Sequence, residues 1–212
     1  MVIGIDDLNN MQLDVLKEIG NIGAGNAATA LARMLDRKVD MGVPRVKILE
    51  FKEVNETLGG AELPVVGLML KVNGDLTGSI LFILQYKAAA TLVNMLMGIP
   101  TDGIEADQCT SPFTEMEISA LKEISNILAG SYLSALSALT NLKILPSVPD
   151  MAIDMAGAIL SVPAIEFGKV GDTVLYIETE FSEGNDKVVG DFFLIPDLRT
   201  YDVLLKALGV IE

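Results

Sequence analysis

The sequence contains no histidine and only one cysteine, Cys109, among 212 residues. Without imidazole, a Ser-His-Asp triad, a Cys-His pair and most zinc sites are excluded. One cysteine can form neither an internal disulfide nor a thiolate cluster, which favours a reducing, cytoplasmic setting. Any chemistry must therefore come from carboxylates, amides, hydroxyls or lysines.

Basic residues are scarce as well. Fifteen Lys and Arg stand against 29 Asp and Glu, a formal charge of −14, and such a surface repels the phosphate backbone of nucleic acids. The N-terminus lacks the basic and long apolar regions of a signal peptide. Charges such as Lys71 and Asp75 interrupt every apolar run before it could span a bilayer. We expect an acidic, soluble protein that binds neither nucleic acid nor the membrane interior.

An internal duplication is visible at a shift of 105 residues. Residues 16–31 match residues 121–136 at ten of sixteen positions, including Leu-Lys-Glu-Ile, Asn-Ile and Ala-Gly. Unrelated sequences of ordinary composition would agree at about one position in sixteen. The chain is therefore predicted to consist of two repeats, at about 10–98 and 114–209, joined by a polar linker at 99–113.

The two repeats predict the same order of elements. Each begins with a long helix, at about 10–36 and 114–141, continues into strands, and closes with a short helix that ends at a glycine. In the first repeat, Asn73-Gly74 joins two apolar runs between residues 65 and 84 and predicts a hairpin. In the second, strands are predicted at 173–179 and 188–195.

This order predicts an α+β fold. We expect one mainly antiparallel sheet shared by the two halves about a pseudo-twofold axis, with the long helices packed on it. The alternative is a pair of independent small domains.

Each predicted long helix has a polar stripe. Residues spaced i, i+4 and i+7 lie on one face of a helix, and this spacing selects matching polar residues in the two repeats. The first stripe comprises Asp14, Glu18 and Asn21, and the second comprises Ser119, Glu123 and Asn126. The apolar face beneath them is predicted to be Val15, Leu16, Ile19 and Ile22 in the first helix and Ala120, Leu121, Ile124 and Ile127 in the second. Both stripes should therefore face solvent.

A carboxylate and an amide three residues apart make an incomplete active site. The amide offers a hydrogen-bond donor and acceptor that can orient a water molecule, and the carboxylate can pair with a lysine or arginine of a partner. Two readings are open: the pairs are solvated surface residues, or each is half of a site that a partner completes.

Small residues in the first helix imitate another motif. Gly23-x-Gly25-x-x-Ala28 resembles a dinucleotide-binding fingerprint, but it lies inside a predicted helix rather than after a strand, and the second repeat lacks it. These glycines are better explained by close helix packing or by the close approach of a partner.

Each stripe is followed by a proline at the same distance. Pro44 follows Asn21 after 22 residues, and Pro149 follows Asn126 after 22 residues. The pattern Asp/Ser-x3-Glu-x2-Asn-x22-Pro, present twice, resembles the signature of the CheC/CheX/FliY family of phosphatases that act on the phosphorylated response regulator CheY. The resemblance covers essentially the whole chain.

The resemblance implies a role for each residue of the signature. It assigns Glu18 and Glu123 to docking on a lysine of CheY, and Asn21 and Asn126 to positioning the attacking water. It gives Asp14 and Ser119 supporting roles and Pro44 and Pro149 structural ones.

The resemblance also implies the partners. It gives the protein no cofactor and no metal of its own, with Mg²⁺ supplied by CheY, and CheD, a receptor deamidase, as a further partner. The rival reading is a non-catalytic adaptor of the flagellar switch type.

Overall fold

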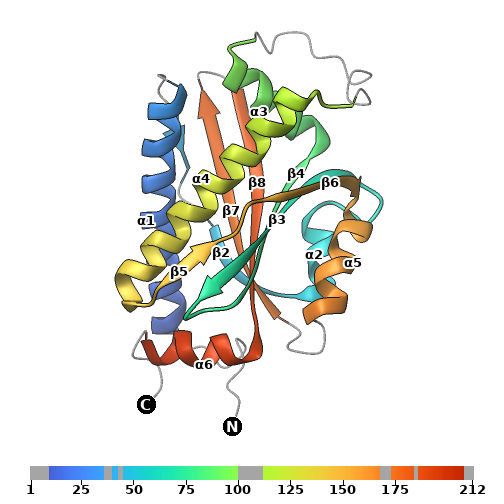
Figure 1. Cartoon of the computed structure of the whole chain (residues 1–212). Coiled ribbons are helices and arrows are strands. Elements are labelled where there is room, and N and C mark those ends of the chain that lie inside the picture. The colour runs from blue at the N-terminus through green and yellow to red at the C-terminus, as the bar shows by residue number, and fades with distance from the viewer. Residues whose placement is uncertain are drawn as a thin grey trace.

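A computed structural model describes residues 10–35, 40–42, 45–99, 112–167, 173–183 and 186–207 (Figure 1). In chain order the elements are α1 (Asn10–Leu35), β1 (Asp40–Met41), β2 (Arg45–Glu50), α2 (Phe51–Thr57), β3 (Pro64–Gly74), β4 (Gly78–Gln85), α3 (Tyr86–Met97), α4 (Glu115–Thr140), β5 (Ile144–Pro146), β6 (Asp150–Met155), α5 (Ala156–Phe167), β7 (Thr173–Glu183), β8 (Asp186–Pro196) and α6 (Leu198–Ala207). No helix among the described residues is long and apolar enough to cross a membrane. Cys109 and most of the predicted linker lie outside the described residues.

The described strands form one eight-stranded sheet in which every pairing is antiparallel. The central order is β7-β8-β4-β3, with β1 and β2 on β7 at one edge and β5 and β6 on β3 at the other. The repeats exchange their first strands, because β2 of the first repeat pairs with β7 of the second and β6 of the second pairs with β3 of the first.

This strand order confirms the predicted α+β fold with a sheet shared between the halves. When each strand is replaced by its counterpart in the other repeat, the same strand order results, read from the opposite edge of the sheet. The pseudo-twofold axis therefore passes between β4 and β8. There Phe82 pairs with Phe192, and their rings stack with centroids 4.4 Å apart. The alternative of two independent domains is wrong, since neither half completes its sheet alone.

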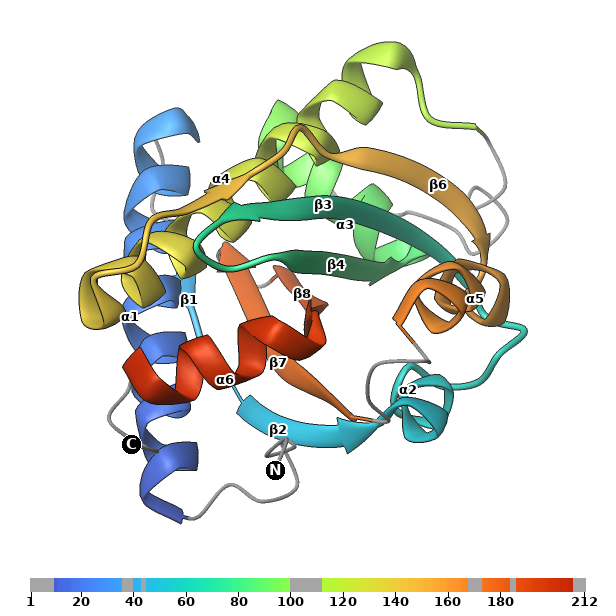
Figure 2. The same ribbon diagram turned by 60° about the horizontal axis from the view of Figure 1, so that its bottom comes forward.

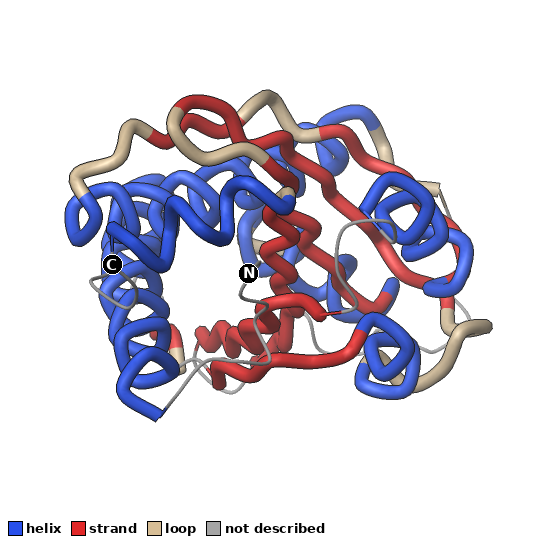
Figure 3. The backbone as a smooth tube through the Cα atoms, turned by 90° about the horizontal axis from the view of Figure 1, so that it is seen from below, coloured by secondary structure: helices blue, strands red, loops and turns tan. Residues whose placement is uncertain are grey.

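The sheet lies between α1 and α4 on one side and α2 and α5 on the other (Figures 2 and 3). It separates two hydrophobic cores. Side chains alternate along each strand, so Phe82 and Phe192 enter the core under α1 and α4. Leu81 and Phe193, their neighbours in the chain, enter the core under α2 and α5. The long helices therefore rest on one face of the sheet, with their outer sides turned away from it.

The long helices also pack on each other, α1 against α4. A Cβ atom on Gly23 would lie 2.4 Å from Cδ1 of Tyr132, so only glycine permits this approach. The Tyr132 hydroxyl lies 2.9 Å from Oγ1 of Thr179, which fixes α4 to β7 beneath it. At the start of α4, Thr114 and Glu117 form a capping box.

The predicted hairpin between residues 65 and 84 is present, but its turn is not the two-residue Asn-Gly type. Val72, opposite Gly78, is the last residue of β3 that pairs with β4. Asn73 and Gly74 continue β3 by pairing with β5, so residues 75–77 connect β3 to β4. Contacts with the other repeat override the local turn preference: Gly74 pairs with Ile144, and the Asp75 carboxylate accepts a hydrogen bond of 2.7 Å from the backbone of Lys143.

The short helices that close the two repeats are α3 and α6, and a glycine, Gly98, ends α3 with a left-handed φ of 65°. Helices α2 and α5 and strands β1, β2, β5 and β6 were not individually predicted, because these short segments lack a clear period. Gly209, the predicted end of α6, lies outside the described residues.

Candidate functional site

Both polar stripes lie on the exposed sides of α1 and α4, as their spacing predicts. The exposed residues are Asp14, Glu18 and Asn21 on α1 and Ser119, Glu123 and Asn126 on α4. The two helices run in opposite directions across the same face of the sheet (Figure 1). Since each stripe precedes the Gly23–Tyr132 contact in its own helix, the stripes lie on opposite sides of the helix crossing.

The apolar face beneath each stripe anchors it, with one exception. Ile19 is 6% exposed, and Leu121 and Ile124 are fully buried. Ile22, predicted to be buried, is 37% exposed, whereas its counterpart Ile127 packs against the core. The difference follows from the neighbours of each helix: α1 contacts α4, β1 and β2, while α4 is also covered by α3 and by β3, β5 and β6.

The other residues predicted for the apolar face are Val15 and Leu16 on α1 and Ala120 on α4. Val15 packs against the core, Ala120 is half-buried, and the side chain of Leu16 lies outside the described residues.

The first residue of each stripe interacts within its own helix. The Lys17 ammonium lies 2.9 Å from Oδ1 of Asp14. The Ser119 hydroxyl donates a hydrogen bond of 2.8 Å to the backbone carbonyl of Glu115. By contrast, the carboxylates and amides that follow have no side-chain partner among the described residues; these are Glu18, Asn21, Glu123 and Asn126.

Of the two prolines of the signature, Pro149 is among the described residues. Pro149 is buried and immediately precedes β6, where its fixed φ suits entry into an extended strand. Pro44 lies outside the described residues.

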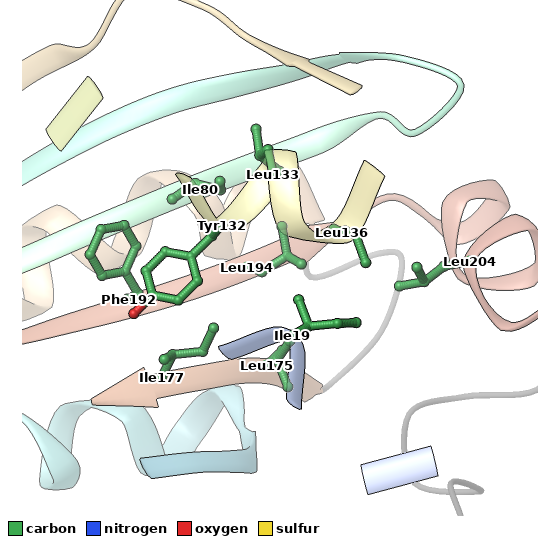
Figure 4. Close-up of a pocket in the computed structure, with 10 residues that line it drawn as sticks. All are labelled: Ile19, Ile80, Tyr132, Leu133, Leu136, Leu175, Ile177, Phe192, Leu194 and Leu204. Carbon is green, nitrogen blue, oxygen red and sulfur yellow. The ribbon is translucent and has the colours of Figure 1, made fainter. Parts of the chain in front are cut away.

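Neither stripe contributes to the two pockets found among the described residues. Beneath the helices, a small cavity of about 30 Å³ is walled by apolar side chains, including Ile19, Tyr132, Leu136 and Leu204 (Figure 4). Its lining offers a water molecule almost no polar partner. The stripe residues are instead exposed on the helix surfaces, which suits contact with another macromolecule rather than enclosure of a small substrate.

A larger pocket of about 250 Å³ lies between the sheet and α5 and was not predicted from any motif. Its walls are mostly apolar, and its carboxylates are those of Asp150 and Asp154. Asp154 Oδ1 accepts a hydrogen bond of 2.7 Å from the backbone of Met155. These two carboxylates have no counterpart in the signature that the two repeats share, so this pocket is a poorer candidate than the stripes.

The sequence also gave no sign of a carboxylate cluster on the sheet face that α2 and α5 cover. The Tyr176 hydroxyl donates to Asp191 Oδ1 at 2.7 Å and lies 3.2 Å from Glu178 Oε2. Burial, with the nearby Glu178 carboxylate adding to it, raises the pKa of Asp191 to about 6, and the tyrosine hydrogen bond opposes the rise. Burial likewise raises the pKa of Tyr176. Arg45 lies 3.1 Å from Glu178 and balances its charge.

The stripes offer carboxylates and amides that can position the groups of a partner. Among the described residues, no group of three or more Asp, Glu, His or Cys side chains is placed to hold a metal ion. An exposed carboxylate and amide on adjacent turns can contact two neighbouring groups of one partner. The geometry thus suits a half-site.

Comparison with known proteins identifies the family. A model of the CheC-like family matches residues 11–48 and 116–153, the two segments that contain both signatures. CheY-P phosphatase CheC of Bacillus subtilis is 41% identical over 200 residues, which cover 93% of this chain and 94% of that protein. The chain belongs to the CheC-like family. The resemblance inferred from the repeated signature is thereby confirmed.

Other relatives of this CheC-like chain extend the comparison. The flagellar motor switch phosphatase FliY of Bacillus subtilis is 31% identical over 145 residues, 68% of this chain and 36% of that protein. The crystal structure of Thermotoga maritima FliY superimposes with a TM-score of 0.71 at 27% identity, covering 94% of this chain and 98% of that one. The fold and the sequence therefore point to the same family.

Proposed function

We propose that this protein is a phosphatase that accelerates hydrolysis of the aspartyl phosphate of phosphorylated CheY. The observation that carries the proposal is the pair of exposed Glu/Asn sites, whose side chains have no partner among the described residues and which lie in the two segments matched by the family model. The Bacillus subtilis relative named CheY-P phosphatase, similar over nearly the whole chain, supports the choice of substrate.

In the proposed reaction the partner supplies most of the chemistry. A water oxygen attacks phosphorus in line, the bond from phosphorus to the aspartyl oxygen breaks, and the carboxylate leaves with the electron pair. The water proton passes to the phosphate product. Phosphoryl transfer needs little covalent help, so positioning and electrostatics account for most of the acceleration. Mg²⁺ on CheY would neutralise charge on the phosphoryl oxygens.

The proposed roles of this chain's residues follow from their chemistry. The Asn21 or Asn126 side-chain carbonyl accepts a hydrogen bond from the attacking water and holds it in line. The Glu18 or Glu123 carboxylate pairs with a lysine of CheY and fixes the orientation of docking. Asp14 supports the first site by holding the neighbouring Lys17 ammonium away from the Glu18 carboxylate.

The proposal includes the setting of the reaction. We propose that the protein needs no cofactor or metal of its own, that it works in the cytoplasm, and that CheD is a second protein partner. The resemblance to the family motivates all three statements.

Replacing both asparagines tests the proposal. In a phosphate-release assay, the double variant Asn21→Ala/Asn126→Ala should leave phosphorylated CheY to decay at its own rate, while each single variant keeps part of the activity. Because both positions are exposed, the free energy of unfolding should change by no more than about 0.5 kcal/mol per site.

A matched control comes from the same helix. Asn26 is an exposed asparagine of α1 outside the stripe, and Asn26→Ala should leave the activity unchanged. Full activity in the double variant would refute the role of the asparagines. Failure of the unsubstituted protein to accelerate phosphate release would refute the phosphatase proposal and favour the adaptor.

A further inference from the structure

Each candidate site continues into a glycine one helical turn beyond its asparagine. Gly25 follows Asn21 by four residues, and Gly130 follows Asn126 by four. Residues four apart lie on the same side of a helix, so both glycines extend the stripes. Gly25 is exposed and Gly130 half-buried.

Nothing among the described residues requires glycine at either position. A Cβ atom on Gly25 or Gly130 would meet no atom within 4 Å, and neither residue has a positive φ. Gly23 is different, since its Cβ would collide with Tyr132. Glycine inside a helix is less favourable than alanine because its unfolded backbone is freer. The duplicated chain bears this disadvantage twice, at equivalent positions.

We propose that Gly25 and Gly130 are contact residues against which the phosphorylated partner's main chain packs, an inference that rests on the proposed function. An asparagine side chain is short, so its amide can hold a water at a phosphoryl group only if the helix comes close to the partner. A side chain one turn away on the same face would stand between the two surfaces. Glycine removes that obstruction and brings the helix backbone itself into contact.

The surroundings of the stripes support contact with a protein. Ile22, next to Asn21, is 37% exposed, and Met116, one turn before Ser119, is 73% exposed. Exposed apolar side chains beside unpaired polar ones are typical of the surfaces by which proteins bind each other. The proposed contact area on each helix therefore combines the Glu/Asn pair, the glycine and an apolar flank.

The experiment isolates one site at a time. Gly25→Ala and Gly25→Leu are made in the Asn126→Ala background, where only the first site works, and Gly130→Ala and Gly130→Leu in the Asn21→Ala background. The KM for phosphorylated CheY should rise from glycine to alanine to leucine, by about tenfold for leucine, with a smaller change in kcat. The melting temperature should stay the same or rise, because alanine and leucine favour helix.

Two control variants separate contact with the partner from stability of the fold. Ala138 is exposed on α4, two turns beyond Gly130, and Ala138→Leu places the same leucine side chain away from the site, so KM should not change. Gly23→Ala should lower the melting temperature, since it collides with Tyr132.

Two outcomes would overturn the inference. If the leucine variants keep the parent's KM, the glycines do not touch the partner, while the phosphatase proposal stands on the parent's activity. If melting temperature and activity fall together, the glycines serve the chain's own fold. Absence of activity in the unsubstituted protein would remove the proposed function and the inference with it.

Discussion

Replacing the partly buried carboxylate of Asp191 by an amide should stabilise the protein near neutral pH. Asp191 lies on β8 directly opposite Glu178 of β7, and both carboxylates face one tyrosine hydroxyl. The Arg45 guanidinium pairs with Glu178 and not with Asp191 in the described structure. The charged form of Asp191 is therefore partly withdrawn from water beside a like charge, and one hydrogen bond, from Tyr176, stabilises it.

The magnitude and the sign follow from the pKa. Its rise from the ordinary 3.8 to about 6 means that the folded protein binds a proton more tightly than the unfolded chain does. The stability from this group is thus fully present below about pH 4 and is lost as pH rises to about 6. The loss amounts to at most about 3 kcal/mol. Asp191→Asn removes this loss, and the amide oxygen can still accept the Tyr176 hydrogen bond.

Urea unfolding at a series of pH values measures the effect. At pH 7.5, Asp191→Asn should be more stable than the parent by about 2–3 kcal/mol, and the difference should shrink towards zero near pH 4. Asp150→Asn, an exposed aspartate on β6, is the matched control and should follow the parent at every pH. Tyr176→Phe should raise the pKa of Asp191 further, since the hydroxyl favours the charged carboxylate. Equal stability of Asp191→Asn and the parent at pH 7.5 would refute the reasoning.

Two further predictions concern α4. The Ser125 hydroxyl is fully buried without a hydrogen-bond partner among the described residues, so Ser125→Ala should raise the free energy of unfolding by about 1 kcal/mol; a decrease in urea unfolding would mean that the hydroxyl is bonded. Thr114→Ala removes the capping box with Glu117 and should lower the free energy of unfolding by about 1 kcal/mol, with phosphatase activity kept. An unchanged unfolding midpoint would show that the cap contributes nothing.

The candidate site was largely predictable from the sequence, because it depends on local order. Glu18 and Asn21 are three residues apart in a helix, so they lie on the same face whatever the helix packs against. The duplication supplied the same information a second time at Glu123 and Asn126. The exposure of Ile22 was not predictable, since it depends on which elements cover α1.

The sequence by itself determined the two-repeat plan, the long helices, the exposed Glu/Asn pairs and, through their repeated signature, the family. These features follow from period, capping and spacing along a continuous stretch of chain. Only the tertiary structure decided that the repeats exchange strands, that Asn73 and Gly74 extend β3 instead of forming a two-residue turn, and that Asp191 is partly buried beside Glu178. Each of these depends on pairing between residues more than 60 positions apart or on the register between strands, which no local pattern encodes.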